Sequence, residues 1–178
     1  FGACDWHTTV SVNGFKVGEH KGGYDPFTFD VTEAFGTTKD ISDEILISVW
    51  DPTDASFQPR GKQVQEPRGI WYTSVTGIWQ TVWLERVPKS FVSSIKIEPD
   101  ADASVVRVTV DSGGAGGKLN AIVYVYDSGE KVVGRYTDIG RELDLPIENP
   151  KLWSPDAPHL YQVVVQFRDG AEVVDTVT

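Results

Sequence analysis

Methionine is absent from this chain, and cysteine occurs once, as Cys4. A single cysteine excludes an internal disulfide, and we expect Cys4 to be a small buried residue because no basic partner lies close to it in sequence. No apolar run approaches the roughly 18 residues of a membrane-spanning helix. The sequence also begins without the basic and apolar regions of a signal peptide. Together with the missing methionine, this start leads us to expect a fragment of a longer gene product, whose organism and compartment the sequence leaves open.

Basic residues are scarce as well, since 16 Lys and Arg stand against 26 Asp and Glu and give a net charge of −10. This charge disfavours non-specific binding to nucleic acid or to an anionic membrane, so we expect neither as a partner. His7, His20 and His159 lack the spacing of metal ligands. Residues 113–117, GGAGG, lack the lysine and the following helix of a phosphate-binding loop. The sequence therefore predicts no metal and no cofactor.

Helical periodicity is also missing, because no helix longer than one turn is predicted and strand-like alternation dominates. Residues 6–12 alternate, and Asn13-Gly14 then predicts a type I′ hairpin turn. Further strands are predicted at 15–17, 27–31 and 44–50. Residues 51–68 show no period and contain three prolines. A loop of this length inside a compact domain is usually functional or disordered.

Aromatic residues are abundant, and three of the six tryptophans fall within residues 69–85. Large apolar side chains occupy both faces of the alternating run 78–85, which predicts a strand buried on both sides. We therefore expect Trp50, Trp79 and Trp83 to be core residues rather than platforms for a sugar ring. Trp6 and Trp153 are expected to pack against their own domains, and Trp71 alone lies in a loop.

The second half of the chain predicts a separate all-β unit. After a linker near residue 88, seven short strand-like runs are separated by glycine-containing turns. They cover residues 91–97, 104–110, 119–126, 131–136, 141–145, 160–167 and 171–177. Seven short strands in about 90 residues are typical of an immunoglobulin-like β-sandwich.

Four motifs occur in one order along nearly the whole chain. They are NGFKVGEHKGGYDPF at 13–27, VWDPTD at 49–54 followed by QPRGKQ at 58–63, GIWQTVWLE at 77–85, and PKLWSPDAPHLY at 150–161. In this order the sequence resembles the non-catalytic domains of family 2 glycoside hydrolases, the β-galactosidase, β-glucuronidase and β-mannosidase group. It is most similar to the β-galactosidase-like members.

The resemblance implies an all-β fold with two domains. Residues 1–88 would be a partial jelly-roll (galactose-binding-like) β-sandwich, the sugar-binding domain, without its first strands. Residues 89–178 would be an immunoglobulin-like β-sandwich. In the family a (β/α)₈ barrel follows these domains and carries the two catalytic carboxylates that retaining hydrolysis needs. No residue here matches the family's catalytic motifs, so we expect the chain alone to be inactive.

The loop 51–68 and the aromatic residues after it are the predicted substrate contacts. Planar or charged side chains can hydrogen-bond sugar hydroxyls, and aromatic rings can stack on a sugar face. The candidate residues are Asp54, Arg60, Lys62, Gln63, Arg68, Trp71 and Tyr72. The family's sugar contact here is a carboxylate or amide shortly before the tryptophan. In this sequence Arg68-Gly69 take that place and Glu66 is the nearest acid, which leaves the identity of the sugar open.

Three functions remain open from the sequence. The first is the β-sandwich region of a family 2 glycoside hydrolase, shaping one wall of the active-site pocket and supporting a barrel, with a terminal β-glycoside as substrate. The second is a carbohydrate-binding module that works without a barrel. The third is a purely structural, adhesin-like pair of domains. The oligomeric state is not predicted.

Overall fold

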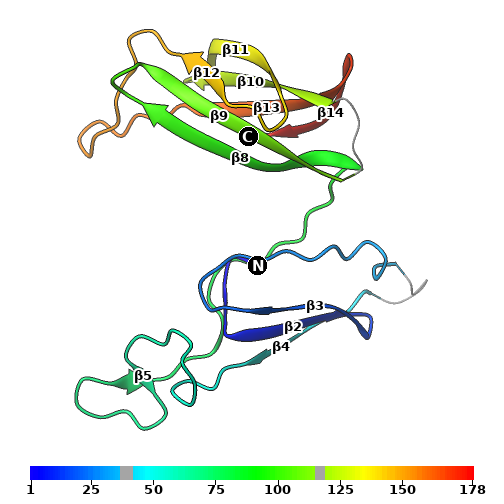
Figure 1. Ribbon diagram of the computed structural model, residues 1–178, viewed down its shortest axis with the longest axis vertical. Helices are drawn as coiled ribbons and strands as arrows, with labels where there is room; N and C mark the ends of the chain where they lie inside the picture. The colour runs from blue at the N-terminus through cyan, green and yellow to red at the C-terminus, as the bar shows by residue number, and fades with distance from the viewer. Residues whose placement is uncertain (37–41, 115–118) are drawn as a thin grey trace. The chain divides into compact units, whose positions relative to one another are not determined.

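The computed structural model describes residues 1–36, 42–114 and 119–178, and every regular element in them is a β-strand. The chain divides into two compact units, Phe1–Leu84 and Glu85–Thr178, which we call unit 1 and unit 2. The predicted fold class is confirmed: it is all-β, with a partial jelly-roll β-sandwich followed by an immunoglobulin-like β-sandwich (Figure 1). A helix able to cross a bilayer is not found in the described ranges.

Unit 1 is built around a three-stranded antiparallel sheet in the order β3-β2-β4. Two smaller sheets pair β1 with β7 in antiparallel and β5 with β6 in parallel orientation. The strands of unit 1 are β1 Cys4–Asp5, β2 His7–Val12, β3 Phe15–Lys21, β4 Ile45–Trp50, β5 Gln63–Val64, β6 Tyr72–Thr73 and β7 Gly77–Ile78. Thr8, Val10 and Val12 are buried along one face of β2, as alternation predicts. Cys4 is a free, buried thiol as expected.

The Asn13-Gly14 turn joins β2 to β3 as predicted. Asn13 has φ 51° and Gly14 has φ 81°, the positive values that a type I′ turn requires. The Asn13 side chain also connects distant segments, because its Nδ2 donates to the Ala34 carbonyl at 2.9 Å and its Oδ1 accepts from the Glu44 amide at 2.9 Å. The same Nδ2 donates to Asp43 Oδ1 at 2.7 Å. The Asn13 side chain thus holds the hairpin turn against the segment that leads into β4.

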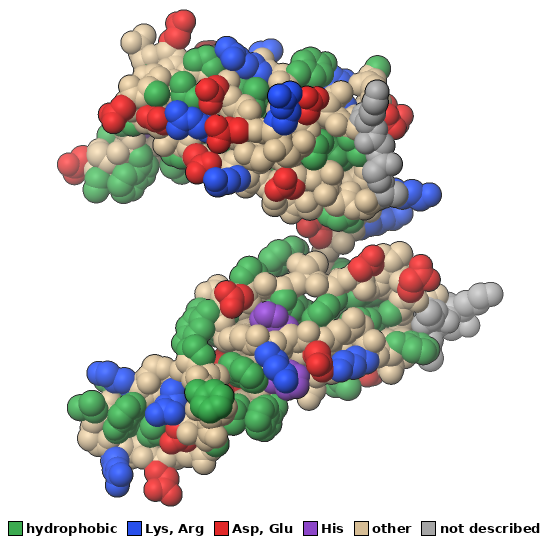
Figure 2. Space-filling view, viewed as in Figure 1, with side chains coloured by type: hydrophobic (Ala, Val, Ile, Leu, Met, Phe, Trp, Pro, Cys, Tyr) green, Lys and Arg blue, Asp and Glu red, His purple; other side chains and the backbone are tan. Residues whose placement is uncertain are grey.

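The tryptophans of unit 1 depart from the prediction. Trp50, Trp79 and Trp83 are 59%, 52% and 58% exposed, so the expectation that they are core residues is wrong. Only Gly77–Ile78 forms a regular strand in the run 78–85, beside β1. Beyond this strand the run makes two described backbone hydrogen bonds. The Gly2 amide donates to the Thr81 carbonyl at 2.8 Å, and the Trp79 amide donates to the Ala3 carbonyl at 3.4 Å. With backbone pairing limited to residues 1–5, this run is not enclosed between two layers. Hydrophobic side chains are visible on the surface of unit 1 (Figure 2).

The predicted strand 27–31 is also absent from the structure. Phe27 is nevertheless buried, with its ring stacked on Phe1 at 4.8 Å and on His20 at 4.3 Å between centroids. Its amide donates to the Phe1 carbonyl at 3.1 Å. The Phe1 amino group donates in return to the Phe27 carbonyl at 3.0 Å. The segment, which follows Pro26, is therefore held by this backbone pair and by ring packing, without a longer strand ladder.

Unit 2 contains all seven predicted strands, but most of them begin or end at residues other than those predicted. They are β8 Ser90–Asp100, β9 Val105–Gly114, β10 Leu119–Asp127, β11 Glu130–Asp138, β12 Leu143–Pro146, β13 Gln162–Asp169 and β14 Glu172–Val177. One sheet has the order β11-β10-β13-β14 and the other β12-β9-β8. The two sheets form the layers of a sandwich (Figure 1). Between them lies a core of aliphatic and aromatic residues: Val108, Val110, Ala121, Val123, Val125, Leu145, Ile147, Val165 and Phe167.

Phe167→Ala tests this core. Phe167 is fully buried between the sheets, and truncating a buried Phe to Ala costs about 3–5 kcal/mol. We expect the free energy of unfolding of unit 2 to fall by that amount, as measured by amide hydrogen exchange in β10 and β13 across a urea series. Val132→Ala, on the exposed side of β11, should change it by only about 0.5 kcal/mol. Equal losses in both variants would contradict the assigned core.

A second prediction concerns the Asn13 bridge. Asn13→Gly keeps the positive φ and removes the side-chain hydrogen bonds, so unit 1 should lose about 1–3 kcal/mol. Asn13→Ala should lose about 1 kcal/mol more, because alanine is strained at this φ. Tryptophan fluorescence in urea reports mainly on unit 1, which holds Trp6, Trp50, Trp71, Trp79 and Trp83. Asn149→Gly is the matched control, because Asn149 has φ 48° but lies in unit 2. A fluorescence transition shifted as much by the control would argue against the bridge.

Candidate functional site

The long loop after β4 is closed at its base by Asp51. Its Oδ1 accepts from the Thr53 amide at 2.8 Å, and its Oδ2 accepts from the Thr76 hydroxyl at 3.2 Å. Asp51 therefore holds the first turn of the loop and ties it to the residue just before β7. Inside the loop, Gln58 Nε2 donates to the Thr53 carbonyl at 2.7 Å, and both residues are buried. The loop thus has a small polar core of its own.

A second set of hydrogen bonds joins the two halves of the segment 51–76. The parallel pair of β5 and β6 places Gln63 beside Tyr72, and the Tyr72 amide donates to the Lys62 carbonyl at 2.8 Å. Gln63 Oε1 accepts from the Val75 amide at 2.6 Å. These contacts run between residues about ten apart, so the segment is a folded lobe. We call residues 51–76 the β4–β7 lobe.

The structure brings some of the predicted site residues together. The Arg60 guanidinium lies 6.0 Å from the centroid of the Trp71 ring, within the range of a cation–π contact. Trp71 and Tyr72 are 39% and 64% exposed, so both rings remain accessible in unit 1. The Trp71 amide donates to the Arg68 carbonyl at 3.0 Å, which makes Arg68 the start of the turn into β6.

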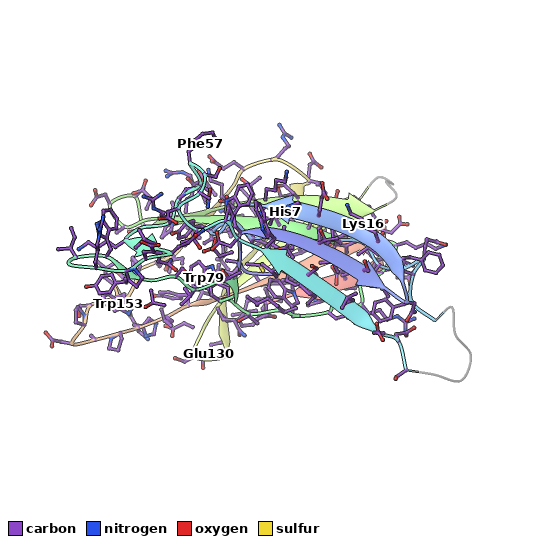
Figure 3. All side chains as sticks on the ribbon, turned by 90° about the horizontal axis from the view of Figure 1, so that it is seen from below. His7, Lys16, Phe57, Trp79, Glu130 and Trp153 are labelled. Atoms are coloured by element: carbon purple, nitrogen blue, oxygen red, sulfur yellow. The ribbon has the colours of Figure 1, made fainter. Side chains whose placement is uncertain are left out.

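Other predicted residues serve the lobe itself. The side-chain oxygen of Gln63 is occupied by the Val75 amide, and Asp54 Oδ1 accepts from the Gln65 amide at 3.4 Å. Asp54 and Lys62 are exposed. The role of all seven candidates in binding a substrate stays a prediction; among them, Trp71 and Tyr72 are exposed and the half-buried Arg60 lies beside Trp71. Phe57, which projects fully exposed from the lobe, was not among them (Figure 3).

A carboxylate pair at the foot of the lobe was not predicted from the sequence. His7 of β2 pairs with Trp50 of β4; Asp5 ends β1 two residues before His7, and Asp51 directly follows Trp50. Burial, and then the charge of Asp51, raise the pKa of Asp5. Asp5 Oδ1 is buried and has no hydrogen-bond partner among the described residues. The strand register could have revealed this neighbourhood, but no local motif marks it.

Gly23 packs tightly against the Asp5 carboxylate. A Cβ on Gly23 would lie 2.7 Å from Asp5 Oδ1, so a larger residue would displace the Asp5 side chain. The Gly23 carbonyl accepts from Trp79 Nε1 at 2.7 Å, and the Trp79 ring meets Tyr24 edge to face at 5.9 Å. Gly23 thus links the half-exposed Trp79 to the foot of the lobe.

In unit 2 the motif at 150–161 is held by a charged cluster. Lys151 Nζ donates to Asp127 Oδ2 at 2.8 Å, and His159 Nε2 lies 3.2 Å from Asp127 Oδ1. Hydrogen bonds from Lys151 and then from Ser128 hold the pKa of Asp127 below its usual range. Trp153, expected to pack within this segment, is instead exposed. The described ranges contain no group of three His, Cys, Asp or Glu residues placed to hold a metal ion.

Asp5 yields a prediction about pH. The pKa of Asp5 is raised in the folded state, so its ionised form opposes folding. Unit 1 therefore gains stability as the pH falls through the folded pKa toward the ordinary value of about 3.9. Asp5→Asn should therefore make unit 1 more stable than wild type near neutral pH, with the difference closing on acidification. Urea unfolding followed by tryptophan fluorescence over a pH series measures this difference.

Asp30→Asn provides a control of opposite sign. The hydroxyl and amide of Thr32 donate to Asp30 and lower its pKa. Its ionised form therefore favours folding above the ordinary pKa, and this contribution is lost as the pH falls through the folded value. Asp30→Asn should be less stable than wild type near neutral pH, with convergence in acid. The same sign for both variants would contradict the assigned environment of Asp5.

Comparisons with known proteins identify the family. The model of "Glycosyl hydrolases family 2" matches residues 90–178, half of the chain. A β-galactosidase of Thermoanaerobacter pseudethanolicus is 29% identical over 95% of this chain and 23% of its own length. A putative β-glucuronidase of Formosa agariphila is 30% identical over 99% of this chain and 21% of its own length.

Solved structures agree in fold. A β-glucuronidase from Ruminococcus gnavus superposes with a TM-score of 0.76 at 22% identity, over 99% of this chain and 32% of that one. A putative β-galactosidase from Bacteroides fragilis superposes with a TM-score of 0.74 at 22% identity, over 99% of this chain and 28% of that one. The chain thus spans about a fifth to a third of the length of each of these four relatives. It belongs to glycosyl hydrolase family 2 and corresponds to a part of these longer relatives.

Proposed function

We propose that this chain is the non-catalytic β-sandwich region of a longer, retaining β-glycosidase. Residues 1–88 form its sugar-binding jelly-roll domain and residues 89–178 its immunoglobulin-like domain. The β4–β7 lobe shapes one wall of the active-site pocket, and both domains support a (β/α)₈ barrel that carries the reaction. The names of the relatives favour a terminal β-galactoside or β-glucuronide as the substrate.

The observation that carries this proposal is the construction of the β4–β7 lobe. Two to five residues suffice to connect strands of a sandwich, yet this lobe has its own buried hydrogen bond and a parallel strand pair. It holds Trp71 and Tyr72 at the surface with Arg60 beside them. Aromatic rings with adjacent charged donors suit a sugar, which presents C–H faces and hydroxyl edges.

The two acids at the foot of the lobe, Asp5 and Asp51, are unsuited to catalysis. Retaining hydrolysis requires two carboxylates about 5–5.5 Å apart on either side of the glycosidic bond. Asp51 uses both of its oxygens to close the lobe, and Asp5 Oδ1 is buried against Gly23. These two acids therefore support the wall of a pocket, and the chemistry belongs to residues outside this chain.

The isolated chain should accordingly hydrolyse neither nitrophenyl β-galactoside nor nitrophenyl β-glucuronide above the buffer rate. The complete gene product should hydrolyse at least one of them. Turnover that copurifies with the isolated chain would refute the assignment. Inactivity of the complete product toward both substrates, with binding of their sugars retained, would favour a carbohydrate-binding module instead.

The role of the lobe is tested in the complete protein with Trp71→Ala and with the double variant Arg60→Ala/Lys62→Ala. Both should lower kcat/KM by about tenfold or more, equivalent to about 1.4 kcal/mol of lost transition-state stabilisation. The free energy of unfolding should change by only about 0.5 kcal/mol in the double variant, because Lys62 is exposed and Arg60 is outside the buried core. Arg86→Ala, exposed at the start of unit 2, is the control. Unchanged kcat/KM in both lobe variants would show that the lobe does not contribute to catalysis or substrate binding.

A further inference from the structure

The outer face of the four-stranded sheet of unit 2 holds polar side chains in an unusual setting. Ala121 and Val123 of β10 point into the core, so the alternating residues Asn120 and Ile122 lie on the opposite face. Ile122 is nevertheless only 5% exposed. Side chains from the neighbouring strands must therefore cover it, and this part of the outer face has an apolar floor.

The strand register identifies the neighbours. Asn120 lies beside Asp138 of β11 and Arg168 of β13, and Ile122 lies beside Tyr136 of β11. Directly opposed residues on one face have Cβ atoms about 4.5–5.5 Å apart, within reach of one small ligand. The side chain of Tyr136 is 65% exposed. We call Asn120, Tyr136, Asp138 and Arg168 the outer-sheet cluster.

Two polar atoms in this cluster lack partners. Asn120 Oδ1 and Arg168 Nε are both buried, and neither has a hydrogen-bond partner among the described residues. The other Arg168 nitrogens are engaged, with NH2 donating to the Ala171 carbonyl at 3.0 Å and NH1 donating to the Tyr136 hydroxyl at 3.4 Å. A buried acceptor and a buried donor left unpaired are unfavourable. A ligand group that both accepts and donates would satisfy the two atoms together.

A polar hollow adjoins these atoms. Asn120, Tyr136, Asp138, Arg141 and Glu142 line it. Arg141 NH1 donates to Asp138 Oδ2 at 3.2 Å, and both side chains are largely exposed. The hollow therefore combines an aromatic ring, an amide, an ion pair and a second carboxylate, and its lining carries one more negative than positive charge.

We propose that the outer-sheet cluster binds one sugar unit of a saccharide. Hydroxyl groups both donate and accept, as the unpaired Asn120 and Arg168 atoms require, and the exposed ring of Tyr136 can stack on the C–H face of a pyranose. The carboxylates of Asp138 and Glu142 beside Arg141 disfavour a free anion. On binding, the sugar replaces the long 3.4 Å contact between Arg168 and Tyr136, which uncovers the two buried atoms. This site lies within unit 2 and does not require that the β4–β7 lobe contacts substrate.

The test uses the 178-residue chain, ¹⁵N-labelled, with methyl β-galactoside, methyl β-glucuronide and lactose as probes. At least one sugar should shift the amide resonances of Asn120, Tyr136 and Arg168 along a saturable curve, with a Kd on the order of 1 mM, corresponding to about −4 kcal/mol. Tyr136→Ala should weaken binding about tenfold or abolish it. Arg168→Lys keeps the charge but removes the guanidinium, and should weaken binding while the remaining spectrum stays that of the folded chain.

Tyr72→Ala is the matched control, because Tyr72 is equally exposed but lies on the β4–β7 lobe; it should leave the unit 2 shifts unchanged. Shifts confined to the lobe would overturn this proposal while supporting the lobe as a sugar contact. No saturable shift at the cluster with any of the three sugars, or unchanged affinity in Tyr136→Ala, would also overturn it. Equal shifts on titration with sodium sulfate would show an anion site instead and would refute the sugar assignment.

Discussion

Each strand of a sheet has two faces, and whether the second face is covered decides the character of both units. In unit 2 two sheets cover each other, and the inward residues of β9, β10 and β13 form one continuous core. In unit 1 the β3-β2-β4 sheet buries Val10 and Val12 on one side, while the tryptophans of the run 78–85 stay half exposed. The same alternation that builds a core in one unit leaves an aromatic surface on the other.

The β4–β7 lobe shows how a long connection can be given a defined shape without regular structure. Asp51 closes its base, the buried bond from Gln58 to Thr53 fills its interior, and Gln63 joins its two halves. Side chains that bind a ligand must be held in place by neighbouring residues, because ordering mobile side chains on binding costs free energy and weakens affinity. Gln63, one of the residues predicted to contact a ligand, is also one of these supports.

Two carboxylates illustrate opposite uses of charge. Asp127 is surrounded by Lys151, Ser128 and His159, and the resulting low pKa keeps it ionised as the anchor of the segment 150–161. Asp5 faces burial and the negative charge of Asp51, so its pKa is raised and its ionised form opposes folding. Unfavourable groups of this kind concentrate at functional sites, and Asp5 lies at the foot of the lobe proposed to line the pocket.

The all-β class, the Asn13-Gly14 hairpin and the seven strands of unit 2 could be predicted from the sequence, because they depend on local alternation and on turn residues with positive φ. The candidate contacts on the segment 51–76 were also named from the sequence. The exposure of Trp79 and Trp83, the ring packing of Phe27 outside any strand and the proximity of Asp5 to Asp51 became visible in the three-dimensional structure. Alternation shows which residues share a face, but whether another layer covers that face, and which distant side chains meet there, depends on long-range pairing that no local pattern contains.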